Sequence, residues 1–214
     1  MEGNKPFFIF DFDGTIADTK DVMIRIANKL ASDIGRPALS EDDIRFFRDY
    51  GVKEFIKKMR LSFFEVMRLL KKGNEIFVSD KESIALVPGV IEAIRKIKDM
   101  GAKTAIITSN SKEGVLKVLG NDISLFDFVI AERNLFGKAP KIIAAAKKAA
   151  SSLDMCVYVG DEPRDIEAAK KAGVKSVAVL WGFSGKQSLM PLAPEFTISS
   201  PSDLLGVFKS LSVG

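Results

Sequence analysis

Histidine is absent from the 214 residues of the chain, and this absence removes several kinds of catalytic site. Serine or cysteine nucleophiles that histidine activates, phosphohistidine chemistry and zinc sites with histidine ligands all need that side chain. Any acid or base must therefore be a carboxylate, a lysine, a tyrosine or a cysteine. A metal site would have oxygen ligands, which suit magnesium, calcium or manganese.

Cysteine is nearly absent as well, since Cys156 is the only one. A single cysteine excludes an internal disulfide framework and fits a reducing compartment such as the cytoplasm. Cys156 lies in an apolar stretch, so we expect a buried core side chain rather than a reactive thiol. No apolar run is long enough to span a membrane. Because no basic stretch followed by a long apolar segment precedes Phe7, we expect no secretory signal. We therefore expect a cytoplasmic protein without a membrane partner.

The charge imbalance is small, with 32 lysines and arginines against 28 aspartates and glutamates and a net charge of +4. Lysine pairs at 57–58, 71–72, 147–148 and 170–171 lie in helical patterns, where a solvated helix face is the better explanation. We therefore expect no nucleic-acid partner. A mild positive field would also help to recruit a phosphorylated substrate. Monomer and dimer both stay open.

The most informative stretch is Phe7–Thr15, an apolar run that ends on Asp11 and Asp13 and continues with Gly14. Side chains at i and i+2 of a strand point to the same side, about 6.5–7 Å apart at Cα, so the two carboxylates can converge. Two such anions need a cation, or one of them must take up a proton. Gly14 permits a sharp turn, and we expect the Thr15 hydroxyl to orient Asp13. A strand that merely ends in polar turn residues is the alternative interpretation of this pair.

Short apolar runs alternate with amphipathic segments along the chain. The expected strands are residues 7–10, 104–108, 128–131, 156–159, 176–180 and 196–198, and the expected helices are 89–100, 111–119, 139–151 and 163–172. This alternation predicts an α/β fold with a Rossmann-like, doubly wound parallel sheet and helices on both faces. The long gap after the first strand has a helical pattern throughout. We expect a core domain over 1–16 and 85–214 and an inserted helical cap domain over 17–84.

The insert is expected to contain four or five helices. The second begins at Ser40 with acidic residues in its first turn, and Phe55, Ile56 and Met59 are expected on a later helix. The apolar residues that we expect to form its core are Met23, Ile26, Ala27, Leu30, Ile34, Phe55, Ile56, Met59, Phe63, Phe64, Met67, Leu69 and Leu70. Since it directly follows the two aspartates, the insert is well placed to cover them.

Polar side chains follow the ends of four expected strands, where open parallel sheets bind ligands. Thr108 and the amides after it precede a helix, which suits an anion. Lys138 places an ammonium before the next helix, and Asp161 ends a later strand with Asp165 close behind. Jointly, these strand ends predict a site for an anion and a cation.

These segments resemble the four-motif pattern of the haloacid dehalogenase-like superfamily. The matching residues are Asp11-Phe-Asp13-Gly-Thr, then Thr108-Ser109-Asn110, then Lys138, then Gly160-Asp161 with Asp165. The stretch from Asp165 to Val179-Leu-Trp-Gly-Phe183 is similar to the phosphoglycolate-phosphatase-like branch, whose members carry a helical cap after the first motif. One departure is Ala139, which separates Lys138 from Pro140 where lysine and proline are commonly adjacent.

The resemblance implies a magnesium-dependent phosphatase that hydrolyses a small phosphorylated metabolite through an aspartyl phosphate on Asp11, with Asp13 as acid and then base. The implied catalytic residues are Asp11, Asp13, Thr108 and Lys138. The implied phosphate-binding groups are Asp13, Gly14, Thr108, Ser109, Asn110 and Lys138. The implied Mg²⁺ site comprises Asp11, the Asp13 carbonyl and Asp161, with Asp165 orienting the waters. Arg25, Arg45, Arg48 and Lys53 on the insert are candidates to contact the rest of the substrate.

Three other functions are retained. A sugar-phosphate mutase of the same superfamily also uses both aspartates, although such mutases commonly have a histidine at the cap hinge. A pyrophosphatase would use the same residues. A catalytically idle binding protein is the non-enzyme alternative, disfavoured because isolated buried acids are costly to keep without a role. The acid Asp13 disfavours a dehalogenase, because halide leaves without a proton.

Overall fold

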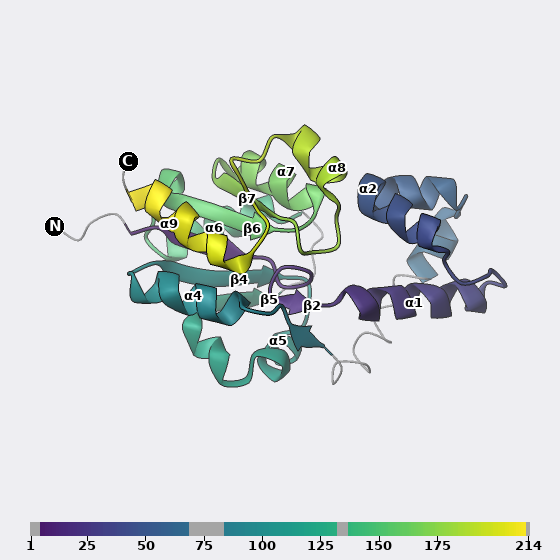
Figure 1. Ribbon diagram of the computed structural model, residues 1–214, viewed down its shortest axis with the longest axis horizontal. Coiled ribbons are helices and arrows are strands. Elements are labelled where there is room, and N and C mark those ends of the chain that lie inside the picture. Colours follow the sequence, from purple (N-terminus) through teal and green to yellow (C-terminus); the bar gives the residue numbers. More distant parts are fainter. Residues whose placement is uncertain (1–4, 69–83, 132–136, 213–214) are drawn as a thin grey trace.

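The computed structural model describes residues 5–68, 84–131 and 137–212 of the chain, apart from the side chains of residues 51–53. Leu69 and Leu70 of the expected insert core, the lysine pair at 71–72 and the Lys53 side chain lie outside this description. A sheet with flanking helices forms one end of the elongated molecule, and helices α1 and α2 form the other (Figure 1).

The sheet contains six parallel strands in the order β5-β4-β1-β6-β7-β8. They are β1 (Phe7–Phe10), β4 (Lys103–Thr108), β5 (Phe128–Ala131), β6 (Cys156–Gly160), β7 (Lys175–Val179) and β8 (Phe196–Ile198). In the middle of the sheet, Phe10 of β1 pairs with Ile106 of β4 and with Val159 of β6. All six strands occur where the apolar runs predicted them, and the expected fold class is confirmed.

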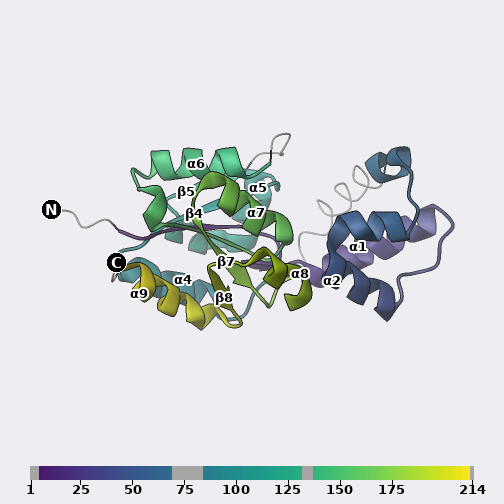
Figure 2. The same cartoon turned by 90° about the horizontal axis from the view of Figure 1, so that it is seen from above.

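Helices cover both faces of the sheet (Figure 2). The first face carries α4 (Val90–Asp99), α5 (Lys112–Leu119) and α9 (Leu204–Ser212), and the second carries α6 (Ala139–Lys148) and α7 (Pro163–Ala172). The short α8 (Lys186–Leu189) follows β7. Within the described ranges, none of the helices combines the length and apolarity that crossing a bilayer requires.

The sequence of β1 explains its central place. All four of its side chains are fully buried. Because side chains alternate along a strand, Phe8 and Phe10 pack on the α4 and α9 face while Phe7 and Ile9 pack on the α6 and α7 face. A strand that is apolar on both faces is stable only between two helical layers. Cys156, also buried, belongs to the second layer as expected, and burial raises the pKa of its thiol to about 12.

The chain leaves and re-enters the sheet region through two short strands that lie side by side. Strand β2 (Ala17–Asp18) pairs antiparallel with β3 (Ala85–Leu86), with Ala17 opposite Leu86. Between them lie α1 (Lys20–Asp33), α2 (Glu41–Lys58) and a helical stretch at residues 63–68. The boundaries 17–84 for a cap domain stay a prediction, supported by this pairing.

Helix α2 begins as predicted but runs further. The Ser40 hydroxyl accepts the N–H of Asp43, and the Asp43 carboxylate accepts the N–H of Ser40, which together form a capping box. Phe55 and Ile56, expected on a separate helix, belong to α2 because the helix continues through Gly51. A glycine inside a helix costs only about 1 kcal/mol, which the remaining turns can offset.

The expected core of the insert is partly wrong. Val22 and Ile26 of α1 are buried together. Four expected core residues are exposed instead: Met23 (43%), Phe63 (72%), Phe64 (83%) and Met67 (51%). The apolar stripe that α1 buries therefore starts one residue earlier than the sequence pattern indicated.

Candidate active site

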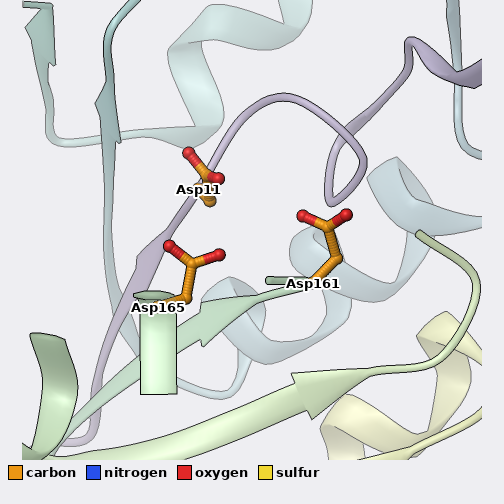
Figure 3. Close-up of side chains that lie close together, drawn as sticks. All are labelled: Asp11, Asp161 and Asp165. Carbon is orange, nitrogen blue, oxygen red and sulfur yellow. The ribbon is translucent and has the colours of Figure 1, made fainter. Parts of the chain in front are cut away.

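Three buried aspartates meet at the carboxyl end of the sheet, where Figure 3 shows their carboxylates gathered around one space. Asp11 follows β1, Asp161 follows β6, and Asp165 lies in the first turn of α7. One ligand oxygen from each lies within 4.8 Å of the others. Strands β1 and β6 are parallel neighbours, so their ends necessarily share this edge.

Lys138, just before α6, reaches into the same cluster. Its Nζ lies 2.8 Å from Asp11 Oδ2 and 2.5 Å from Asp165 Oδ1, and its side chain is only 7% exposed. The second oxygen of Asp165 accepts the N–H of Glu162 at 3.1 Å. Protein donors therefore engage both Asp165 oxygens. Although Ala139 separates Lys138 from Pro140, Lys138 still contacts Asp11.

The charges of the cluster do not balance. Burial raises the pKa of Asp11, which Lys138 only partly offsets. Burial also raises the pKa of Asp161 well above its ordinary value, and the neighbouring Glu162 and Asp165 add to the effect. Burial disfavours the Lys138 ammonium, but Asp11 and Asp165 outweigh it and raise the Lys138 pKa. Glu162 adds a fourth carboxylate and pairs with Arg164. Lys138 and Arg164 together supply two positive charges to four carboxylates, so a further cation would stabilise the site.

Asp13 lies apart from the three clustered carboxylates and contacts Asn110. The Asn110 Nδ2 group donates to Asp13 Oδ1 and Oδ2 at 3.0 and 2.9 Å. Burial and the negative charge of Asp11 raise the Asp13 pKa to about 7, although the Asn110 hydrogen bond opposes the rise. A carboxyl with this pKa can both give and take a proton near neutrality.

The second expected segment lies at the end of β4. Thr108 is fully buried, and its hydroxyl accepts the N–H of Asn110 at 3.0 Å. Ser109 is exposed. Helix α5 begins after its N-cap residue Ser111, whose hydroxyl accepts the N–H of Gly114. The structure thus connects the end of β4 to Asp13 through the Asn110 amide. Phosphate binding by Thr108, Ser109 and Asn110 stays a prediction.

Thr15 does not orient Asp13, contrary to expectation. Its hydroxyl donates to Asp161 Oδ1 at 3.3 Å. The cause is the turn at Gly14, whose φ of 71° lies in the left-handed region and whose N–H donates to Ala17. This turn directs Thr15 toward the end of β6. A Cβ at Gly14 would lie 2.3 Å from Asp161 Oδ2, so the close approach also requires glycine.

The loop after β7 holds Asp161 from the other side, which sequence reasoning missed. The Phe183 N–H donates to Asp161 Oδ2 at 2.7 Å, and the Trp181 Nε1–H donates to the Thr15 carbonyl at 3.1 Å. A Cβ at Gly182 would lie 2.2 Å from the Asp161 Cβ. The available sequence signal was a glycine between two aromatic residues directly after a strand.

The donors at this site suit Mg²⁺. Asp11 and Asp161 offer carboxylate oxygens that are buried and close together, and hard divalent cations prefer such oxygen ligands. Asp161 is fixed by the Thr15 hydroxyl and the Phe183 N–H. Such outer contacts are typical of metal ligands in proteins.

Comparisons with known proteins agree with this geometry. Residues 8–179 match the sequence pattern of the haloacid dehalogenase-like hydrolases. A phosphoglycolate phosphatase from Synechococcus elongatus is 32% identical over 205 residues, which cover 95% of this chain and 97% of that protein. Pyrophosphatase PpaX from Listeria innocua is 26% identical over 216 residues, covering 98% and 99% of the two chains.

A solved structure shares the fold of this chain. A haloacid dehalogenase-like family hydrolase from Streptococcus pneumoniae superposes with a TM-score of 0.80 at 20% identity, covering 96% of this chain and 99% of that one. The family match and the Synechococcus elongatus relative confirm the prediction that the chain is an enzyme. The chain belongs to the haloacid dehalogenase-like hydrolase family and is similar to its phosphoglycolate-phosphatase-like branch.

Proposed function

We propose that this enzyme is a magnesium-dependent phosphatase that hydrolyses a small phosphate monoester, with phosphoglycolate as the first candidate. The observation that carries the proposal is the buried cluster of Asp11, Asp161 and Asp165 around Lys138. A carboxylate nucleophile and a phosphate dianion repel each other, and a cation in this cluster would overcome that repulsion. The phosphoglycolate phosphatase of Synechococcus elongatus supports the choice of substrate.

The first step is a displacement at phosphorus. Lys138 contacts Asp11 Oδ2, which leaves Asp11 Oδ1 to attack. A bond forms between this oxygen and phosphorus while the bond from phosphorus to the alkoxide oxygen breaks. Asp13 donates its proton to the departing alkoxide, so that the alcohol leaves neutral and Asp13 becomes a carboxylate.

The second step hydrolyses the aspartyl phosphate. Asp13, now ionised, accepts a proton from a water molecule whose oxygen attacks phosphorus. The bond between phosphorus and Asp11 breaks, which releases inorganic phosphate and restores both aspartates. The Asp13 pKa of about 7 suits both directions of this proton transfer.

The remaining groups would hold the ion and the phosphate. Mg²⁺ would neutralise charge on the phosphate and polarise it toward attack. Asp11, Asp161 and the Asp13 carbonyl would hold the ion. Asp165, which pairs with Lys138 and accepts the Glu162 N–H, would act indirectly by orienting the waters. Thr108 and Lys138 would neutralise the other phosphate oxygens.

A pyrophosphatase is the second candidate, because pyrophosphatase PpaX from Listeria innocua is 26% identical over almost the full chain. Its leaving group would be phosphate, which departs readily without a donated proton. Loss of Asp13 would then matter less than for an alkyl ester.

The proposed location of the enzyme is the cytoplasm. The lone, buried Cys156 supports this location, because a reducing compartment suits a chain without disulfides.

The test is a panel of phosphorylated compounds at equal concentration with Mg²⁺, including phosphoglycolate, sugar phosphates and pyrophosphate. We expect wild type to release phosphate from a carboxylated monoester, and Asp11→Asn to lower that rate by about 10³-fold or more. The control is Asp122→Asn, the same change in an aspartate that pairs with Arg95 far from the cluster; it should be as active as wild type.

Other outcomes would overturn the proposal. Transfer of phosphate between sugar hydroxyls without release would identify a mutase. If wild type and Asp11→Asn were equally inert while wild type bound nucleic acid tightly at physiological salt, the chain would be a binding protein.

A further inference from the structure

The loop at residues 181–185, which follows β7, contacts Asp161 on its inner side. The Phe183 N–H donates to Asp161 Oδ2 at 2.7 Å. Trp181 donates to the carbonyl of Thr15, whose hydroxyl donates to Asp161 Oδ1 at 3.3 Å. The 181–185 loop therefore fixes one Asp161 oxygen directly and the other through Thr15.

The outer side of the same loop contacts α2 of the insert, which lies beside α8 in both views (Figures 1 and 2). Arg48 Nε donates to the Phe183 carbonyl at 3.2 Å, and the Gly185 N–H donates to the Arg48 carbonyl at 2.9 Å. The Phe47 ring meets the Phe183 ring edge to face, with centroids 4.7 Å apart. Phe183 thus bonds Asp161 through its N–H and Arg48 through its carbonyl.

We infer that Arg48 is a positioning residue for Asp161. The affinity of the site for a divalent ion then depends on the contacts between α2 and the 181–185 loop. This inference rests on the proposed function. The N–H and carbonyl of Phe183 are joined through a single Cα, so a guanidinium that fixes the carbonyl also restricts the direction of the N–H. Contacts that orient a metal ligand contribute to metal affinity even when they do not touch the ion.

The coupling is reciprocal. A cation that binds better when Asp161 is oriented must favour the arrangement in which Arg48 and Phe47 contact the loop. Binding of the ion would therefore stabilise α2 against the core before any substrate contacts the insert. The sequence made Arg48 a candidate to contact the substrate. In this arrangement its guanidinium instead holds the 181–185 loop through the Phe183 carbonyl.

The test measures Mn²⁺ binding without substrate, by the electron paramagnetic resonance signal of the free ion. We expect Arg48→Ala to weaken Mn²⁺ binding about three- to tenfold, less than loss of a direct contact to a ligand. The control, Lys57→Ala, removes a cation from the same helix; Lys57 pairs with Glu54, is 62% exposed and lies away from the loop. It should bind Mn²⁺ as wild type does. Saturating Mg²⁺ should restore most of the Arg48→Ala turnover, which a general structural defect would not permit.

A second variant guards against misfolding. Phe47→Leu removes the ring contact with Phe183 but keeps the guanidinium, and we expect a smaller loss of Mn²⁺ affinity in the same direction. Thermal unfolding reports whether each variant is folded. If Arg48→Ala fails to fold, Phe47→Leu carries the test, and wild-type affinity in that variant would contradict the inference.

The inference and the proposed function fail differently. Mn²⁺ affinity of Arg48→Ala equal to that of Lys57→Ala would overturn the inference and leave the phosphatase proposal intact. A wild-type protein that binds no divalent ion would overturn the proposed function, and the inference with it.

Discussion

Asp13 combines a partly buried position, a nearby anion and a hydrogen bond from Asn110. Its folded-state pKa of about 7 is above the ordinary value of 3.8, so ionisation opposes folding. The stability that the neutral form provides is fully present below about pH 4 and is lost as the pH rises through 7.

Asp13→Asn should therefore stabilise the metal-free protein at high pH, because asparagine cannot ionise. At pH 8 we expect its free energy of unfolding to exceed that of wild type by about 1–3 kcal/mol, and the difference should shrink toward pH 4. Urea denaturation in the presence of a chelator measures both values. A difference that is the same at pH 4 and pH 8 would assign the effect to packing instead.

Asn110→Ala should slow the enzyme according to its leaving group. Without the amide, the Asp13 carboxyl loses two hydrogen bonds that hold its orientation. We expect turnover of an alkyl phosphate to fall about tenfold, within the range for a hydrogen bond to a charged group. Nitrophenyl phosphate should be affected much less, since its leaving group needs no proton.

Steady-state rates on both esters give this comparison. The control is Asn121→Ala, which removes an exposed amide from the segment after α5 and should change neither rate. Equal losses on the two esters would remove Asn110 from any role in protonating the leaving group.

Residue types alone predict much of the site. Asp11, Asp161 and Lys138 were predictable because charged side chains at strand ends are conspicuous and parallel strand ends converge. The partner of Thr15 was not predictable, because it depends on how the Gly14 turn directs the hydroxyl. Phe183 was missed since it acts through its backbone N–H, which every residue except proline has.

At the scale of elements, periodicity was sufficient for the sheet and its helices. Apolar runs of strand length and amphipathic segments between them indicated all six strands. The insert was harder to predict, because α1 buries only Val22 and Ile26 and none of the described side chains of α2 is fully buried. Phe47 of α2 packs instead on Phe183, which follows β7. Sequence pattern shows which side chains are apolar, but does not show which neighbour covers them.

The loop after β7 gives a prediction at this scale. In Gly182→Ala, the new methyl group would lie 2.2 Å from the Asp161 Cβ, so the loop or Asp161 must shift. We expect at least a hundredfold loss of phosphatase activity and a weakened response to Mg²⁺. Measuring activity across a range of Mg²⁺ concentrations checks both effects.

Gly206→Ala is the matched control for that substitution. Gly206 lies in α9, where a methyl group added at its Cα would have nothing within 4 Å, and glycine in a helix is less stable than alanine by about 0.5–1 kcal/mol. This variant should keep full activity and unfold at a slightly higher temperature. Full activity in Gly182→Ala would contradict the prediction, because it would show that the loop can shift without moving Asp161.

At the scale of the whole molecule, the chain enters and leaves the insert through one pair of short strands. Ala17 and Asp18 lie opposite Leu86 and Ala85, so a two-residue Asn-Gly turn in place of residues 19–84 would close a regular hairpin. We expect the shortened protein to fold, with a free energy of unfolding lower by about 1–3 kcal/mol because Phe183 loses its cover.

The shortened protein should still hydrolyse nitrophenyl phosphate slowly, but it should discriminate poorly between phosphate monoesters. Circular dichroism and the same substrate panel measure these properties. Retained discrimination would place substrate recognition within the sheet domain.

The order of the strands in the sheet could not be predicted from the sequence, because periodicity identifies each strand but not the strands beside it. The observed order has a consequence for how the protein is made. Phe7 of the central strand pairs with Lys103 and Cys156, so β1 cannot complete its hydrogen bonds until most of the chain has left the ribosome. At a synthesis rate of about 5–20 residues per second, the phenylalanines of β1 stay without their neighbouring strands for many seconds. Helices α1 and α2, which need only local contacts to form, are synthesised during that interval, and a nascent chain stalled there would offer chaperones an unpaired apolar strand.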